Sequence, residues 1–335
     1  MKTTEPAICI RCVLPASFPG VTFSDDGVCN YCRDFPGLEE IESEKEEYRK
    51  QFEALVEQHR RKDGYDCLVC FSGGKDSTYT LDLFRTVYDL KVLAFTLDNG
   101  FISPVAKENI VRVVESLDVD HVFFKPRFQL LKKIYSTSAS GDLYSPKSLE
   151  RASGICTSCI GIVKFSSLRL AIDKNIPFIG FGWSPGQAPI RSSVMRTNPQ
   201  FVRANQKAIQ KPLLDRLGSS VNVYFLQDHH FEDAERFPYN VHPLAFHEYC
   251  EEKIYSRMAE LSWEKPPDTD PNSTNCLLNA YANAVHEKRY GFNPYVFEVA
   301  KLVREGVLAR DEGLRRFDEK SSEQELVSIQ NRLDR

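Results

Sequence analysis

Eight of the ten cysteines in this 335-residue chain fall into four pairs with the spacing Cys-x-x-Cys. The two pairs nearest the start are Cys9 with Cys12 and Cys29 with Cys32. Each pair can place two thiolates on one tetrahedral ion while the segment between the pairs folds over it. The spacing therefore predicts a zinc site. We expect it to be structural, because four thiolates leave no open position for a substrate.

A third pair, Cys156 and Cys159, comes just before a predicted helix, and a helix N-terminus lowers the pKa of a nearby thiol. Cys276 lies far along the chain but can return to the same cleft once the chain folds. These three thiols are candidates for reactive groups or for ligands of a metal centre.

Other cysteines and the histidines give weaker signals. Cys67 and Cys70 lie inside a predicted strand, where residues three apart face opposite sides, so we expect both to pack in the core. Cys250, on a helical stretch, is expected to pack as well. The histidines of the C-terminal half show no metal-ligand spacing, so we interpret them as packing or surface residues before a metal site or general base. They are His229, His230, His242, His247 and His286.

The sharpest chemical motif is a glycine loop between an apolar strand at 67–71 and a helical stretch at 78–88. The residues of this loop are Ser72, Gly73, Gly74, Lys75, Asp76 and Ser77. The glycines let the backbone approach a ligand closely, and the free N–H groups at the helix start attract an anion. Lys75 adds positive charge, and the carboxylate of Asp76 suits Mg²⁺. The motif predicts a phosphate site, although its spacing is not that of a Walker A loop.

Short apolar runs alternate with helix-length segments through the middle of the chain, which predicts a parallel sheet with helical crossovers. The predicted strands are 67–71, 92–97, 122–124 and 176–181. Helices are expected at 38–61, 246–261, 275–289 and 294–305, with a loop at 264–273. We therefore expect an α/β fold in four parts: a zinc ribbon (1–36), a helical connector (37–64), a nucleotide-binding domain (65–225) and a helical C-terminal region (226–335).

The glycine loop resembles the motif of the PP-loop ATP pyrophosphatase superfamily, which it matches at Ser72, Gly73, Gly74, Asp76 and Ser77. The resemblance extends over about residues 65–225. It implies an enzyme that cleaves ATP between its α- and β-phosphates, with Mg²⁺ on Asp76, and adenylates an oxygen of an acceptor. A nitrogen or sulfur nucleophile then displaces AMP.

The same resemblance suggests further nucleotide contacts at the carboxyl ends of the strands. The backbone of Thr96 and Leu97 and the side chain of Asp98 are candidates to lie beside adenine and ribose, although a simple turn explains Asp98 equally well. Gly182, Ser184 and Gln187 are candidates to close over the nucleotide. Arg191 and Arg196 follow in the sequence. They are candidates to bind a phosphate or an anionic substrate, or they are ordinary surface residues.

Two segments near the start, 9–15 and 23–32, and a third at 306–314 resemble the N-acetyl sugar amidotransferase family. This resemblance implies nitrogen transfer to an N-acetyl sugar or similar small molecule, with ammonia from a glutaminase partner. The rival reading is sulfur transfer, because Cys156, Cys159 and Cys276 resemble the ligands of the 4Fe–4S cluster in PP-loop tRNA thiolation enzymes. We expect nitrogen transfer first, sulfur transfer with a sulfur-donor partner as the alternative, and a non-catalytic nucleotide sensor as a second alternative.

Composition limits the partners. Lys and Arg number 43 against 47 Asp and Glu, so the formal charge is −4 and tRNA is less expected than a small-molecule acceptor. No signal-peptide pattern and no apolar run of roughly 18 residues stands out, so we expect no membrane segment and a cytoplasmic location.

Overall fold

The computed structural model describes residues 7–318 and 322–334. It is an α/β fold around a six-stranded sheet with the strand order β3-β2-β1-β4-β6-β5. All neighbouring strands are parallel except the antiparallel pair β5 and β6. The strands are β1 (Cys67–Cys70), β2 (Val92–Leu97), β3 (Asp120–Phe124), β4 (Phe178–Phe181), β5 (Val194–Arg196) and β6 (Tyr239–Val241). The predicted α/β fold with a largely parallel sheet is confirmed.

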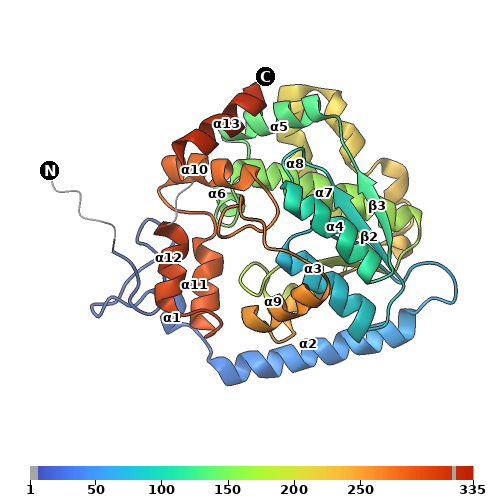
Figure 1. The fold of residues 1–335 in the computed structure, drawn as a ribbon, viewed down its shortest axis with the longest axis horizontal. Coiled ribbons are helices and arrows are strands. Elements are labelled where there is room, and N and C mark those ends of the chain that lie inside the picture. The colour runs from blue at the N-terminus through green and yellow to red at the C-terminus, as the bar shows by residue number, and fades with distance from the viewer. Residues whose placement is uncertain (1–6, 319–321, 335) are drawn as a thin grey trace.

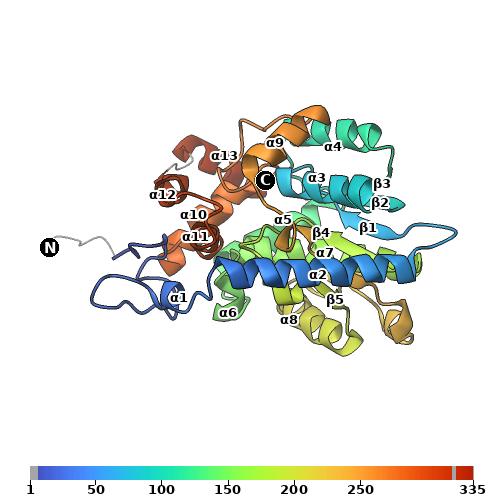
Figure 2. The same cartoon turned by 90° about the horizontal axis from the view of Figure 1, so that it is seen from below.

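Helices cover both faces of the sheet (Figures 1 and 2). The longer helices are α2 (Leu38–His59), α3 (Lys75–Asp82), α4 (Pro104–Ser116), α5 (Phe128–Ser140), α7 (Gly154–Asp173), α8 (Pro199–Leu217), α9 (Glu251–Glu260), α10 (Leu278–Tyr290), α11 (Val296–Arg304), α12 (Arg310–Asp318) and α13 (Glu323–Asp334). Two short helices are α1 (Asn30–Arg33) and α6 (Pro146–Leu149). The predicted connector helix at 38–61 is confirmed as α2.

Two hydrophobic clusters lie on opposite sides of the sheet. One joins α2, α3, α4 and α9 and includes Phe52 and Met258. The other joins α5, α7, α8 and α10 and includes Phe165. Cys67 belongs to the first cluster and Cys70 to the second, as strand alternation predicts. The predicted core packing of this pair is confirmed.

The sequence reading missed two strands. β5 and β6 have three residues each, too few to produce a recognisable alternation, and β6 lies beyond residue 225, where the strand signal fades. β6 nevertheless pairs with β4, so the sheet continues past that residue. The expectation for Cys250 was also wrong, because this residue lies half-buried directly before α9 and outside the core clusters of the described residues.

Helix α7 has the length and apolar composition of a membrane span, which the sequence reading overlooked. More than half of its apolar window is buried, and the helix packs on α5, α8 and β1. We therefore interpret α7 as the central core helix on its side of the sheet.

The four-cysteine module, residues 7–36, lies at one end of the molecule beside α11 and α12 (Figure 1). A third hydrophobic cluster joins it to this C-terminal pair: Phe18 and Val28 of the module pack with Val296, Val299 and Ala300 of α11. The start of the chain and the helices near its end thus form one packed unit.

Candidate functional site

The glycine loop connects β1 to α3 at the carboxyl edge of the parallel strands, where α/β folds bind ligands. Gly73 has φ +78°, and a Cβ there would lie 2.6 Å from the carbonyl oxygen of Ala106. The Ser77 hydroxyl donates to the Gly74 carbonyl (3.0 Å) and accepts from the Ser72 N–H (3.1 Å). These contacts hold the loop in a tight turn that only glycine permits at residue 73.

Lys75 and Asp76 lie together in a polar cluster beside this loop. The Lys75 Nζ lies 2.8 Å from Glu251 Oε1, 3.1 Å from Asp76 Oδ1 and 2.5 Å from the Tyr249 hydroxyl, which in turn donates to Asp76 (2.8 Å). Burial alone would lower the pKa of Lys75, but its anionic neighbours raise that pKa well above the usual value. Lys75 is therefore a fixed positive charge at neutral pH.

A cavity of about 320 Å³, the loop cavity, opens over this cluster. Its polar lining includes Lys75, Asp76, Tyr249 and Glu298, together with Arg316, which pairs with Glu251 at 2.7 Å. The cavity offers both cations and carboxylates, which suits a phosphate ligand accompanied by a divalent cation.

A later segment of the chain lies against the loop. The Lys75 N–H donates to the Thr274 hydroxyl at 2.8 Å, and the Trp263 indole N–H donates to the Gly73 carbonyl at 2.8 Å. Cys276, two residues after Thr274, forms an antiparallel bridge with Ile102 just beyond the end of β2. This strap, residues 263–276, therefore contacts the glycine loop through Trp263 and Thr274 and ends at Cys276 beyond the end of β2.

Gly182, Ser184 and Gln187 follow β4 as predicted, and Gly182 lies next to the loop. A Cβ on Gly182 would lie 2.6 Å from both Cα and N of Ser77, so only glycine allows this approach. The Ser184 hydroxyl donates to Glu298 Oε1 at 2.5 Å, and the Gln187 side chain accepts from the Ser184 N–H at 3.0 Å. Ser184 and Gln187 therefore support α11, and their backbone borders the site.

Thr96, Leu97 and Asp98 lie at the carboxyl end of β2, but their side chains are engaged locally. The Thr96 hydroxyl donates to the Phe71 carbonyl at 2.5 Å, and Asp98 Oδ1 accepts from the Gly100 N–H at 2.9 Å. Asp98 also lies 3.3 Å from Lys107. The structure thus gives the Asp98 carboxylate the role of a turn residue and leaves backbone groups for any contact with a nucleotide.

Arg191 and Arg196 are turned away from the loop. Arg191 pairs with Glu44 of α2 at 2.9 Å, and Arg196 pairs with Glu235 at 2.5 Å. Their side chains are largely exposed, so of the two alternatives the surface role is the one observed.

Cys156, Cys159 and Cys276 converge. The Asn99 amide nitrogen lies 3.2 Å from the Cys276 sulfur and 4.0 Å from that of Cys159, and the Tyr135 hydroxyl donates to Cys159 at 3.6 Å. Within the described residues, only the N-terminal cysteines bring three or more ligand atoms within 4.8 Å of one another. The three convergent thiols therefore do not form a site for one tetrahedral ion in this arrangement.

The expected fall in the pKa of these thiols does not occur. Cys156 lies in the first turn of α7, yet burial raises the pKa of Cys156 to about 12 and that of Cys159 to about 11. Burial therefore raises the pKa of these thiols by more than the helix N-terminus lowers it. Free thiolates are thus disfavoured at neutral pH at these positions.

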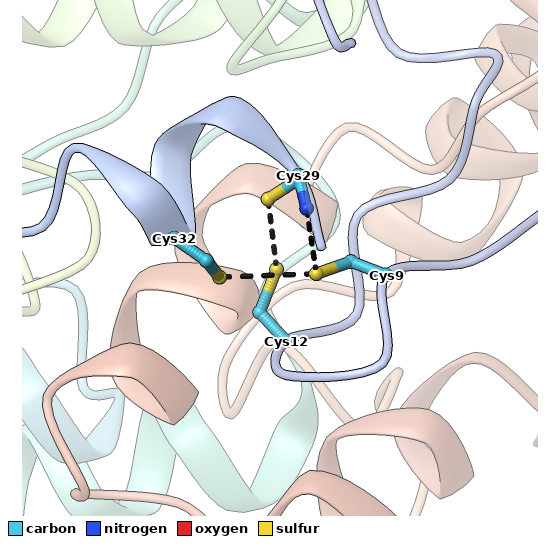
Figure 3. Close-up of side chains that lie close together, drawn as sticks. All are labelled: Cys9, Cys12, Cys29 and Cys32. Carbon is cyan, nitrogen blue, oxygen red and sulfur yellow. Dashed lines mark hydrogen bonds between the residues drawn. The ribbon is translucent and has the colours of Figure 1, made fainter. Parts of the chain in front are cut away.

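The four N-terminal cysteines point toward one centre (Figure 3). The sulfurs of Cys9 and Cys32 lie 3.8 Å apart, and those of Cys12 and Cys29 lie 3.7 Å apart. A tetrahedral ion with metal–sulfur bonds of about 2.3 Å requires sulfurs roughly 3.8 Å apart, so these residues fit a single ion. The Cys29 N–H also donates to Cys9 at 3.3 Å, as backbone amides do around bound thiolates.

Several residues of the loop cavity were missed from the sequence. Tyr249, Glu251, Glu298 and Arg316 come from the C-terminal third of the chain, and no spacing relates them to a loop near residue 75. One feature of the sequence could have indicated Thr274, its position two residues before the candidate ligand Cys276.

The chain matches no protein-family model. It is 23% identical over 274 residues to an uncharacterized protein of Methanocaldococcus jannaschii, MJ1599, a match that covers 82% of this chain and 80% of that protein. Among solved structures, it is similar to the U34-tRNA thiolase NcsA from Methanococcus maripaludis with its 4Fe–4S cluster. That likeness has a TM-score of 0.36 and 16% identity and covers 96% of this chain and 91% of NcsA, which is too distant to transfer a function.

Proposed function

We propose that the protein is an ATP-dependent sulfur transferase. It would activate a carbonyl oxygen of an acceptor by adenylation, with release of pyrophosphate, and then replace that oxygen with sulfur as AMP leaves. The observation that carries this proposal is the position of Cys276. Through Thr274 its strap contacts the phosphate loop, and its sulfur lies near Asn99 with that of Cys159.

The loop residues would bind and orient the triphosphate of ATP. The N–H groups at the start of α3 and the fixed charge of Lys75 would hold the departing pyrophosphate. Asp76, accessible from the loop cavity, would hold the Mg²⁺ that neutralises its charge. The close approach of Gly182 to Ser77 supports a nucleotide site at the neighbouring carboxyl ends of β1 and β4.

Cys156, Cys159 and Cys276 would supply three ligands to a 4Fe–4S cluster. Such a cluster would leave one iron without a protein ligand and so provide a place for sulfide. The convergence of these three half-buried thiols supports this assignment.

This assignment reverses the preference for nitrogen transfer. The meeting of Cys159 and Cys276 at Asn99 supports sulfur transfer, because an amidotransferase needs no such group of thiols. A sulfide source, rather than a glutaminase, would be the partner. A non-catalytic nucleotide sensor remains the second alternative. Like an amidotransferase, it would need no iron–sulfur cluster.

We further propose that Cys9, Cys12, Cys29 and Cys32 bind structural zinc, since their sulfurs match a tetrahedral ion.

The division into a ribbon, a connector, a nucleotide-binding domain and a C-terminal region is also a proposal. The loop cavity supports the last part of it, because Tyr249, Glu251 and Arg316 complete that cavity from beyond residue 225.

Anaerobic metal and sulfide analysis of the purified full chain tests the proposal. We expect one zinc, about four irons and about four labile sulfides per chain. The Cys276→Ser variant should lose iron and sulfide but keep zinc, because its position is remote from the four-cysteine module.

Cys250→Ser is the matched control, since Cys250 is half-buried and lies outside both cysteine groups. It should retain all the iron. Zinc without iron in the wild-type protein after anaerobic reconstitution with ferrous iron and sulfide would reject sulfur transfer and restore the amidotransferase or sensor readings.

A further inference from the structure

Each of the three convergent thiols lies beside a buried side chain that carries an N–H or O–H donor. The pairs are Asn99 with Cys276 (3.2 Å from donor to sulfur), Tyr135 with Cys159 (3.6 Å) and Asn279 with Cys156 (3.8 Å). The three donor side chains are buried and come from the turn after β2, from α5 and from α10. Separate elements of the fold thus supply one donor to each sulfur.

The backbone fixes the orientation of Asn99. Its side-chain oxygen accepts from the Phe101 N–H at 2.8 Å, so the amide nitrogen is the end of the side chain that faces the thiols. The same nitrogen lies 4.0 Å from the sulfur of Cys159. Asn99 therefore presents its donor to two of the three thiols.

Asn279 is oriented through a chain of hydrogen bonds that ends on a carboxylate. The Asn283 amide nitrogen donates to Asp270 at 3.2 Å and to the Asn279 side-chain oxygen at 3.0 Å. Because an ionised carboxylate can only accept, the direction of both amides is fixed. The Asn279 amide nitrogen is left to face Cys156 and the Tyr295 hydroxyl, which lies 2.9 Å away.

Tyr135 is held by the core. Its side chain is fully buried in the hydrophobic cluster that joins α5, α7, α8 and α10. A hydroxyl in such surroundings is costly unless it is paired, and among the described residues Cys159 is the partner to which it donates. The phenol is therefore directed at this sulfur.

Donors of this kind favour a negatively charged sulfur. A hydrogen bond to an ionised acceptor is stronger than one to a neutral acceptor, and a protonated thiol is a weak acceptor. The four-cysteine module differs, because a cation, Arg304, lies 3.7 Å from the sulfur of Cys12. Two amides and a phenol instead stabilise charge on the three convergent sulfurs without adding charge of their own.

We propose that Asn99, Tyr135 and Asn279 are positioning residues that hold the three thiols as ligands of an iron–sulfur cluster and raise its reduction potential. This inference rests on the proposed function. Hydrogen bonds to the sulfurs are among the factors that set the potential of such a cluster. The reduced cluster carries one more negative charge than the oxidised cluster, so the donors stabilise the reduced form more. Loss of one donor therefore lowers the potential.

A redox titration of the anaerobically reconstituted full chain with dithionite, followed by electron paramagnetic resonance, tests this proposal. Tyr135→Phe removes the hydroxyl and keeps the ring. At the midpoint potential of the wild-type cluster, the ratio of reduced to oxidised cluster in this variant should fall at least about threefold.

Tyr144→Phe is the matched control. Tyr144 is also a buried tyrosine whose hydroxyl hydrogen-bonds to a side chain of α7, but its partner is Ser158 and not a thiol. Its ratio of reduced to oxidised cluster should equal that of the wild type. An equal fall in the Tyr135 and Tyr144 variants would show that the change comes from disturbed packing and would overturn the proposal.

Asn99→Asp tests the second donor. Aspartate keeps an acceptor for the Phe101 N–H but presents a carboxylate oxygen to Cys276 in place of the amide nitrogen. Iron content after reconstitution should fall at least about fivefold, because the carboxylate repels an anionic sulfur, while zinc content stays unchanged. Full iron content with the wild-type potential would contradict the role of Asn99.

The outcomes also separate this inference from the proposed function. A wild-type protein that takes up no iron after reconstitution would overturn both. Iron that binds to the wild type and is lost in Cys276→Ser, together with equal potentials in the wild type and Tyr135→Phe, would overturn the donor assignment alone. A lower potential in Tyr135→Phe and an unchanged potential in Tyr144→Phe would support it.

Discussion

At the residue scale, Glu298 lines two cavities, the loop cavity and a second cavity of about 320 Å³ that Cys156 also lines. Ser184 donates to it at 2.5 Å, and a Cβ on Gly186 would lie 2.6 Å from its backbone oxygen. Burial raises its pKa to about 7, which means that the fold favours the protonated carboxyl. Glu298 therefore ties the stability of the site to pH.

This pKa predicts the direction of the pH dependence. The folded pKa exceeds the unfolded value of about 4.3, so the contribution of Glu298 is present at low pH and is lost as pH rises through 7. From pH 6 to pH 8 the free energy of unfolding should fall by about 1 kcal/mol through this group. Urea unfolding at pH 6 and pH 8 measures this change in the free energy of unfolding. The Glu298→Gln variant should lack the part of the change that comes from Glu298. An equal fall in the wild type and the variant would show that Glu298 titrates normally.

At the element scale, α11 links the four-cysteine module to the site. Val299 and Ala300 on this helix pack into the hydrophobic cluster of the module, while Glu298 lines both cavities. Arg310, at the start of α12, donates to the carbonyls of Cys9 and Cys12, each at 3.0 Å. The module thus supports a helix that carries part of the site.

This packing predicts that loss of the metal affects more than the module. Cys9→Ser should lose the zinc and lower the free energy of unfolding by at least ~3 kcal/mol, because the folding of such modules depends on the ion. Metal analysis and thermal unfolding measure the two effects. Cys67→Ser is a useful comparison, since it alters a buried cysteine of the sheet without touching the metal site. Full zinc content in Cys9→Ser would show that Cys9 is not a ligand.

At the scale of the whole molecule, net charge bears on the choice of acceptor. The chain carries −4, and both cavities are of small-molecule size. RNA binding through many phosphates requires a surplus of basic residues, which the chain as a whole lacks.

We therefore expect weak dependence of acceptor binding on salt. The affinity of the protein for a small neutral acceptor should change less than about twofold between 50 and 200 mM KCl, whereas the affinity for an acceptor held through six phosphates would fall about a thousandfold. Titration at the two salt concentrations measures this. Tight binding of bulk tRNA with a steep salt dependence would instead indicate an RNA acceptor.

The sequence by itself determined the features that depend on neighbours along the chain. The strands 67–70 and 92–97, the glycine turn, the helix after it and the cysteine pairs near the start are each defined within a few residues, because strand alternation, glycine backbone freedom and ligand spacing act locally. The largely parallel α/β fold followed from their alternation.

Only the tertiary structure decided what lies around the loop. It brought Cys276 to Cys159 and placed Tyr249 and Glu251 on Lys75. It also raised the thiol pKa values that helix position alone would lower. These outcomes depend on burial and on contacts between residues more than a hundred positions apart, which no local pattern in the sequence records.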